Sequence, residues 1–181
     1  MRQPFRRVMH TSARLGIQRV GANHLRVQRV VASQGDRPPS LLPYAVPMPP
    51  ELSDDELRFL HDVVELARTG DTARLTGLLD AGVPVNLSTP SGDTLLLLAA
   101  YHMHLDTVRA LLTRGADTAR INDRGQTAVG AAVFRQAGPV VQALLDAGAD
   151  PRLGRQSGYA VADVFELPDM RALLDSYRPS T

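Results

Sequence analysis

The sequence contains no cysteine, no lysine and no tryptophan, and only eight of its 181 residues are aromatic. The absence of cysteine excludes disulfide bonds and thiolate metal sites. No stretch of residues 1–35 reaches the roughly 18 consecutive apolar residues that a membrane helix needs, and none has the apolar core of a secretory signal. The length suits one domain with a sizeable core, with or without a tail.

Charge divides the chain into two parts. Residues 1–50 contain eight arginines and one acidic residue, whereas residues 51–181 contain twelve arginines and eighteen acidic residues. The first part therefore carries about +7 and the second about −6, which indicates different roles or different histories. Six prolines between residues 36 and 50 prevent a continuous helix there. We predict that residues 1–50 are a disordered, arginine-rich and proline-rich tail and linker.

Three interpretations of this basic tail stay open. An arginine-rich, acid-free segment with serine and threonine is typical of a mitochondrial transit peptide. A basic tail also binds anionic lipid or nucleic acid nonspecifically. The interpretation that we favour is a disordered extension, in which case Met48 is a candidate for the true start of translation.

A five-residue pattern recurs at a fixed interval in the rest of the chain. LLDAG occurs at residues 78–82 and 144–148, and LLTRG lies midway between them at 111–115, so the period is 33. Within each copy the i, i+3, i+4 spacing predicts one apolar helix face, and the following glycine predicts a left-handed C′ residue. The series in register are Gly82, Gly115 and Gly148; Gly92, Gly125 and Gly158; Leu75, Val108 and Val141; Leu78, Leu111 and Leu144; and Leu79, Leu112 and Leu145.

A unit of this size cannot bury its apolar face alone, whereas stacked neighbours can. The period therefore predicts an all-α solenoid of about four helix-turn-helix units with short hairpin loops, over residues 51–177. The predicted units are residues 53–88, 89–121, 122–154 and 155–177.

The 33-residue unit, with Gly-Xaa-Thr, two helices and LLDAGAD, resembles an ankyrin repeat. The resemblance extends from residue 53 to about residue 176, and residues 92–117 match the family pattern best. It implies an ankyrin-repeat solenoid with a concave surface that binds other proteins.

The sequence departs from the family pattern in two places within the units. The Thr-Pro-Leu-His box reads TLLL at residues 94–97 and TAVG at residues 127–130, which removes the proline that suits the first helical position. The glycine between the two helices is Gly70 in the first unit but Met103 and Gln136 in the next two. We expect lower stability than in an idealised array.

The first and last units of the predicted array differ from the interior units. Ser53 and Glu56 form the pattern of a capping box at the first helix. The last unit is shortened, because its leucine pair follows Gly158 more closely than the leucine pairs of the interior units follow their glycines, and Pro168 opens its final helix. The residues of the first helix expected to face inward are Leu57, Leu60, Val64 and Ala67.

The sequence contains few candidates for catalytic or metal-binding residues. His102 and His104 are two positions apart, so on a helix they point in different directions and cannot chelate one metal ion, unless the chain is extended there. No Gly-Xaa-Ser-Xaa-Gly nucleophile motif is present. We predict no catalytic residue, no metal site and no cofactor.

The resemblance implies a binding surface made of hairpin tips and of the inner end of each first helix. Tyr101 and Phe134 are equivalent by the 33-residue step and should lie side by side; simple packing between units is the alternative interpretation. The predicted partner-binding residues are Arg68, Thr69, Ser91, Asp93, Tyr101, His102, Arg124, Gln126, Phe134, Arg135, Arg155 and Tyr159.

These features favour a non-catalytic, monomeric, cytoplasmic protein that binds an unidentified protein partner. Five arginines at or near the predicted face, namely Arg68, Arg120, Arg124, Arg135 and Arg155, favour an acidic partner. The alternative function is tethering to nucleic acid or a membrane surface by the tail, and the alternative location is the mitochondrion.

Overall fold

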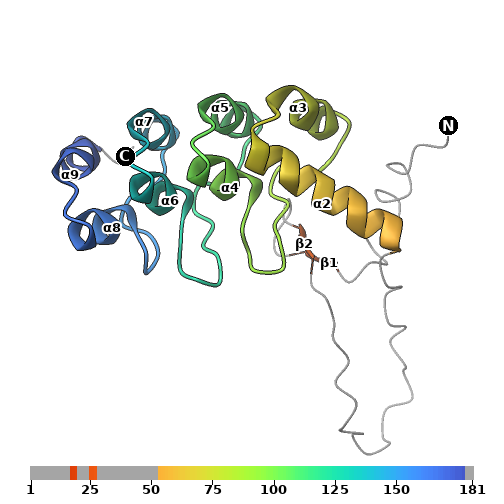
Figure 1. The fold of residues 1–181 in the computed structure, drawn as a ribbon, viewed down its shortest axis with the longest axis horizontal. Helices are drawn as coiled ribbons and strands as arrows, with labels where there is room; N and C mark the ends of the chain where they lie inside the picture. The colour runs from red at the N-terminus through yellow and green to blue at the C-terminus, as the bar shows by residue number, and fades with distance from the viewer. Residues whose placement is uncertain (1–16, 20–24, 28–52, 178–181) are drawn as a thin grey trace, which may run out of the picture.

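The computed structural model describes residues 17–19, 25–27 and 53–177 of the chain. Residues 53–177 form four pairs of antiparallel helices that stack in one row (Figure 1). The helices are α2 (Asp54–Thr69), α3 (Thr72–Asp80), α4 (Leu95–Tyr101), α5 (Leu105–Thr113), α6 (Ala128–Phe134), α7 (Gly138–Asp146), α8 (Gly158–Val164) and α9 (Pro168–Asp175).

The helices form two layers because the two helices of each pair differ in composition. The inner helices α4 and α6 read LLLLAAY and AVGAAVF, and all but the last residue of each is buried. They pack between neighbouring inner helices on both sides, with an outer helix behind them. The outer helix α5 buries only Thr107, Val108 and Leu111, as expected for an amphipathic helix on the surface.

The period seen in the sequence is a structural period. Leu78, Leu111 and Leu144 each occupy the seventh position of an outer helix, in α3, α5 and α7. Leu111 and Leu144 are fully buried, whereas Leu78, in the first outer helix that the structure describes, is half-buried. The predicted all-α repeat solenoid is therefore confirmed.

The turn residues follow the prediction as well. Gly82, Gly115 and Gly148 come directly after the C-caps of the outer helices, with φ of 106°, 78° and 82°. A left-handed residue at this position satisfies the last helical carbonyls, and glycine adopts it without a steric cost.

The last repeat differs from the prediction. The N-caps of α4, α6 and α8 are Thr94, Thr127 and Ser157, so the step between inner helices falls from 33 to 30. Gly158 is therefore the first residue of α8, not a hairpin glycine, and its place in the predicted series was wrong.

The shorter step comes from the hairpin loop. The segment between α7 and α8 covers positions 147–157, whereas the segment between α5 and α6 covers positions 114–127. The connection between the paired helices keeps its length, at positions 135–137 and 165–167.

The first helix begins as predicted. The Ser53 side chain accepts a hydrogen bond from the Glu56 backbone N–H, and the Glu56 carboxylate accepts one from the Ser53 N–H, which completes the capping box. Of the four residues expected to face inward, Leu60, Val64 and Ala67 are buried. The expectation for Leu57 was wrong, because Leu57, in the first turn of α2, is 44% exposed.

Within the predicted tail, β1 (Ile17–Arg19) pairs with β2 (Leu25–Val27) in an antiparallel ladder, with Gln18 opposite Arg26. The remainder of the tail, and with it the predictions of disorder, of a transit peptide and of tethering, lies outside the described residues. Among the helices that the structure describes, none is long and apolar enough to cross a membrane.

Candidate functional site

A groove of about 490 Å³ runs along the concave side of the stack. One wall consists of the inner helices α4, α6 and α8, and the other of the hairpin loops before α4, α6 and α8. Because successive repeats place equivalent residues side by side, each wall presents a row of related side chains. The lining residues are Arg68, Asp93, Leu97, Leu98, Tyr101, His102, Arg124, Gln126, Gly130, Phe134, Gln156, Val161 and Phe165.

Three aromatic rings form a row along the helical wall. Tyr101 and Phe134 are the last residues of α4 and α6, and their rings are stacked with centroids 6.2 Å apart and planes at 10°. Phe165 follows α8 and meets Phe134 edge to face at 5.2 Å. Such pairs are favourable arrangements of aromatic rings. The prediction that Tyr101 and Phe134 lie side by side is confirmed.

Burial along the aromatic row bears on the alternative that these rings serve only for packing between repeats. Tyr101 is half-buried, whereas Phe134 is 41% exposed and Phe165 is 54% exposed. Apolar side chains packed between repeats in this protein, such as Val129 and Val133 of α6, are fully buried. The row therefore packs against itself and also offers apolar surface to the groove.

Positive charge surrounds the Tyr101 end of the row. The Arg135 guanidinium carbon lies 5.4 Å from the centre of the Tyr101 ring, a cation–π contact. Arg68 forms an ion pair with Glu65, one turn earlier in α2. Burial lowers the pKa of the His102 imidazole, and the nearby positive charges of Arg68 and Arg135 lower it further, so the neutral ring is favoured.

The hairpin wall is held together by a polar network around Asp93. One Asp93 carboxylate oxygen accepts hydrogen bonds from Asn122 Nδ2 at 2.6 Å and from Arg124 at 3.1 Å. Ser91 donates to the other oxygen at 3.2 Å. Asp93 is thus buried and linked to the next hairpin, while the Arg124 side chain stays 62% exposed. The surface that Asp93 offers to a partner is therefore small.

The structure brings most of the predicted binding residues together. Arg135 lies beside the groove through its contact with Tyr101, whereas Thr69, Ser91 and Arg155 are exposed but do not line it. The predicted residues that line the groove are Arg68, Asp93, Tyr101, His102, Arg124, Gln126 and Phe134.

Tyr159 is the exception among the predicted residues. It lies inside α8, at the position that Val129 holds in α6, and it packs against the hydrophobic core. Its hydroxyl donates to the carbonyl oxygen of Leu174 at 3.1 Å. A step of 33 makes Tyr159 the counterpart of Gln126 in the preceding hairpin, but this count was an error because the chain takes a step of 30 here.

The same error hid Phe165, which extends the aromatic row into the last repeat. A signal for the shorter step was present, because the letters ALLD begin at residue 143 and again at residue 172, a step of 29. At the observed step of 30 the counterpart of Phe134 is Val164, the last residue of α8, and Phe165 follows it directly.

His104 contacts the end of α2 in the first repeat. His104 Nε2 lies 2.9 Å from the carbonyl oxygen of Arg68, and its ring packs over Gly70. The described residues contain no group of three or more histidine, aspartate or glutamate side chains that could hold a metal ion.

Arg120 does not line the groove, and its Nε atom lies 3.6 Å from Asp117.

Comparison with known proteins agrees with this architecture. The family model of ankyrin repeats in three copies matches residues 60–154. A putative ankyrin repeat protein of Pseudomonas aeruginosa is 50% identical over 60 residues, which cover 33% of this chain and 35% of that protein.

Two eukaryotic relatives match smaller fractions of their own length. The rabbit ankyrin repeat, SAM and basic leucine zipper domain-containing protein 1 is 33% identical over 122 residues, or 65% of this chain and 24% of that protein. The human NAD-capped RNA hydrolase NUDT12 is 39% identical over 69 residues, or 38% of this chain and 15% of that protein. The matched stretches thus span at most about a third of these relatives.

Ankyrin repeats are generally protein–protein interaction modules and typically have no catalytic activity. The period of the helices, their arrangement in two layers and the family match over half of the sequence lead to one assignment. The chain belongs to the ankyrin repeat family.

Proposed function

We propose that this protein is a non-catalytic adaptor that binds a partner protein in its concave groove. The observation that carries the proposal is the aromatic row of Tyr101, Phe134 and Phe165, flanked by Arg135. Aromatic and arginine side chains contribute most of the binding energy at protein interfaces. The row also lies on a rigid stack of helices, so binding needs little rearrangement.

The charges of the groove support an acidic partner. Glu65 pairs with Arg68 and Asp93 pairs with Arg124, which neutralises these two cations. Within the part of the chain that the structure describes, neither Arg135 nor Arg155 forms an ion pair with a carboxylate. A carboxylate of the partner protein placed near Arg135 would gain an ion pair next to an aromatic surface. A monomeric state and a cytoplasmic location stay predictions.

The test is affinity capture from native lysate with the tagged full-length protein, followed by mass spectrometry. Tyr101→Ala together with Phe134→Ala is expected to lower capture of the specific partner at least about tenfold, because it removes two anchors of the aromatic row. The matched control is Arg109→Ala with Gln142→Ala, on the exposed side of the outer helices, which should leave capture unchanged. Equal capture by the wild type and the aromatic double variant would contradict the proposal.

A charge-reversed pair of variants tests the acidic character of the partner in the same assay. Arg135→Glu should weaken capture by repelling a carboxylate, whereas Arg109→Glu on α5 should not. Capture that is indifferent to Arg135→Glu and to salt concentration would refute an acidic partner while leaving the binding site itself in place.

A further inference from the structure

The inner helix of the first repeat is longer than the others. Helix α2 has 16 residues where α4 has seven, and the 33-residue step places Asp62 opposite Leu95, the first residue of α4. The first two turns of α2, residues 54–61, therefore extend beyond the start of the other inner helices (Figure 1). A pocket of about 250 Å³ lies between this extension and the first hairpin loop.

The walls of this pocket are mainly apolar. Leu57 and Leu60 come from the extension of α2, Val64 from the next turn, and Leu87 and Pro90 from the hairpin. The exposure of Leu57 follows from this placement, because its side chain forms a wall of an open pocket rather than part of the core. Such an arrangement suits the apolar body of a ligand side chain.

One polar side chain of the pocket is buried without a partner in the part of the chain that the structure describes. Ser88 is 1% exposed, and its hydroxyl oxygen has no hydrogen-bond partner among the described residues. Burying an unpaired hydroxyl lowers stability, so such groups are rare in native structures. The equivalent residue of the next hairpin is Ile121. The repeat therefore does not require a hydroxyl at this position.

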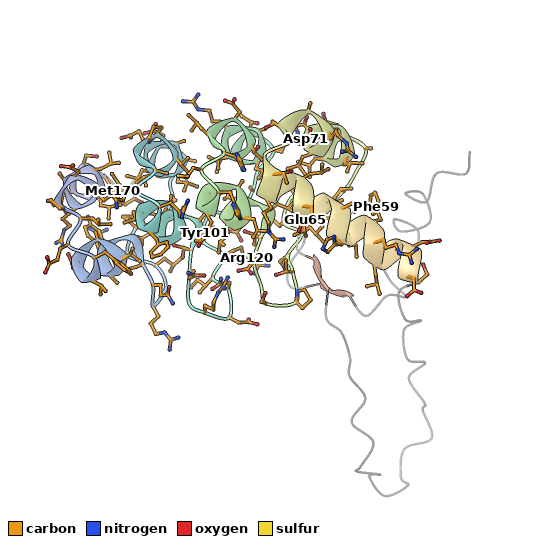
Figure 2. All side chains as sticks on the ribbon, in the orientation of Figure 1. Phe59, Glu65, Asp71, Tyr101, Arg120 and Met170 are labelled. Carbon is orange, nitrogen blue, oxygen red and sulfur yellow. The ribbon has the colours of Figure 1, made fainter. Side chains whose placement is uncertain are left out.

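The pocket and the concave groove share one lining residue. Arg68 lines both cavities, and its partner Glu65, labelled on α2 in Figure 2, also lines the pocket. His61 Nε2 lies 3.8 Å from a Glu65 carboxylate oxygen. The charged lining groups are thus paired with one another, and the other lining residues are apolar except for Ser88 and Thr89.

We propose that this pocket binds one aromatic side chain with a polar edge, a tryptophan or a tyrosine of the partner protein. The ring would pack against the leucines and Val64, and the indole N–H or phenol O–H would hydrogen-bond to Ser88 Oγ. A leucine or phenylalanine would leave the hydroxyl unpaired, and a charged side chain would lose its hydration against the apolar walls. This inference rests on the proposed function, since the partner in the groove would supply the side chain.

The test uses small probes in place of the unidentified partner. N-acetyltryptophanamide and N-acetyltyrosinamide are titrated into the isotope-labelled full-length protein and followed by NMR, with N-acetylphenylalaninamide as the apolar comparator. The expected result is saturable shifts at Leu87, Ser88 and residues 57–61. One additional hydrogen bond predicts that the tryptophan and tyrosine probes bind about fivefold more tightly than the phenylalanine probe.

Two variants assign the interaction to the hydroxyl. Ser88→Ala should weaken the tryptophan and tyrosine probes about fivefold and should not weaken the phenylalanine probe. Ser88→Leu should fill the pocket and abolish binding of all three, with folding checked by circular dichroism; if Ser88→Leu does not fold, Ser88→Ala decides. The proposal is overturned by the absence of saturable shifts at the pocket, or by equal weakening of all three probes in Ser88→Ala.

The probe experiment separates this inference from the function on which it rests. Tyr101→Ala with Phe134→Ala should leave probe binding unchanged, because neither residue lines the pocket. Failure of the probes to bind, with capture still dependent on the aromatic row, would overturn the pocket alone. Probe binding at the pocket, with capture independent of the aromatic row, would overturn the groove as the partner site and retain the pocket.

Discussion

At the scale of single residues, the position between the two helices of each repeat requires a backbone conformation that most side chains disfavour. Gly70, Met103, Gln136 and Glu166 all adopt a positive φ, at 77°, 63°, 53° and 51°. In this left-handed region a Cβ atom crowds the backbone, and only glycine escapes the cost. The sequence-based expectation of lower stability at Met103 and Gln136 thus has a structural cause.

Replacing the strained residue should stabilise the protein. Gln136→Gly is expected to raise the free energy of unfolding by up to about 1 kcal/mol, because relief of strain outweighs the greater entropy of glycine in the unfolded chain. Gln136 is exposed, so little packing is lost. Urea denaturation measures the change. The control Gln136→Ala keeps the Cβ atom and should gain nothing; a glycine variant no more stable than the alanine variant would refute the explanation.

Gly70 shows why the same position is not interchangeable between repeats. A Cβ atom at Gly70 would lie 2.5 Å from Nδ1 of His104, which follows the equivalent position of the next repeat. The counterpart of His104 beside Met103 is Ala137, whose small side chain leaves room for the methionine. Glycine is thus required at the position on which His104 packs. A larger residue is accepted in the next repeat, where alanine stands in place of that histidine.

At the scale of structural elements, the hairpin loops are joined by polar contacts rather than by a continuous sheet. Asp93 of one hairpin binds Asn122 and Arg124 of the next, and the backbone N–H of Asp123 donates to the Ser91 carbonyl at 3.0 Å. The hairpin wall of the groove therefore depends on a buried carboxylate that was predicted from the sequence to bind a partner.

Asp93→Ala tests this structural role. It should lower the free energy of unfolding by about 1–3 kcal/mol, since it leaves the Asn122 and Arg124 donors with fewer partners in a partly buried site. Chemical denaturation provides the measurement. Asp62→Ala, an exposed carboxylate on α2, is the control and should change stability by less than about 0.5 kcal/mol. An equal effect of the two substitutions would show that the network contributes nothing.

At the scale of the whole molecule, stability depends on how many neighbours each repeat has. Interior repeats pack on two sides, whereas among the described helices the last pair, α8 and α9, packs mainly on α6 and α7. Helix α9 buries Leu174 alone, while its counterpart α7 buries Val140, Val141, Leu144 and Leu145. The array is therefore weakest at its C-terminal end.

Hydrogen exchange should reveal this gradient. Among the described helices, α9 is expected to exchange fastest and α4 to α7 slowest, because terminal repeats open without disturbing the others. Leu174→Ala should speed exchange in α8 and α9 and leave α2 to α5 unchanged, as measured by mass spectrometry. A uniform acceleration over all helices would show instead that the four repeats unfold as one unit.

The sequence by itself determined the repeat, its helices and the terminal glycines. These features depend on local spacing. Because the same packing requirement recurs in every unit, the residue types that meet it recur in the sequence with the same period. For the same reason the side-by-side placement of Tyr101 and Phe134 could be predicted, because equivalent residues of adjacent repeats must be neighbours.

Only the tertiary structure decided features that depend on contacts between segments. The shortened hairpin before α8 changed the step, placed Tyr159 inside α8 and added Phe165 to the aromatic row. Burial of Asp93 depends on the next hairpin, and the pocket at Ser88 depends on the extension of α2 over the first. Periodicity fixes which residues are equivalent, but the depth at which each is buried depends on the neighbour that covers it.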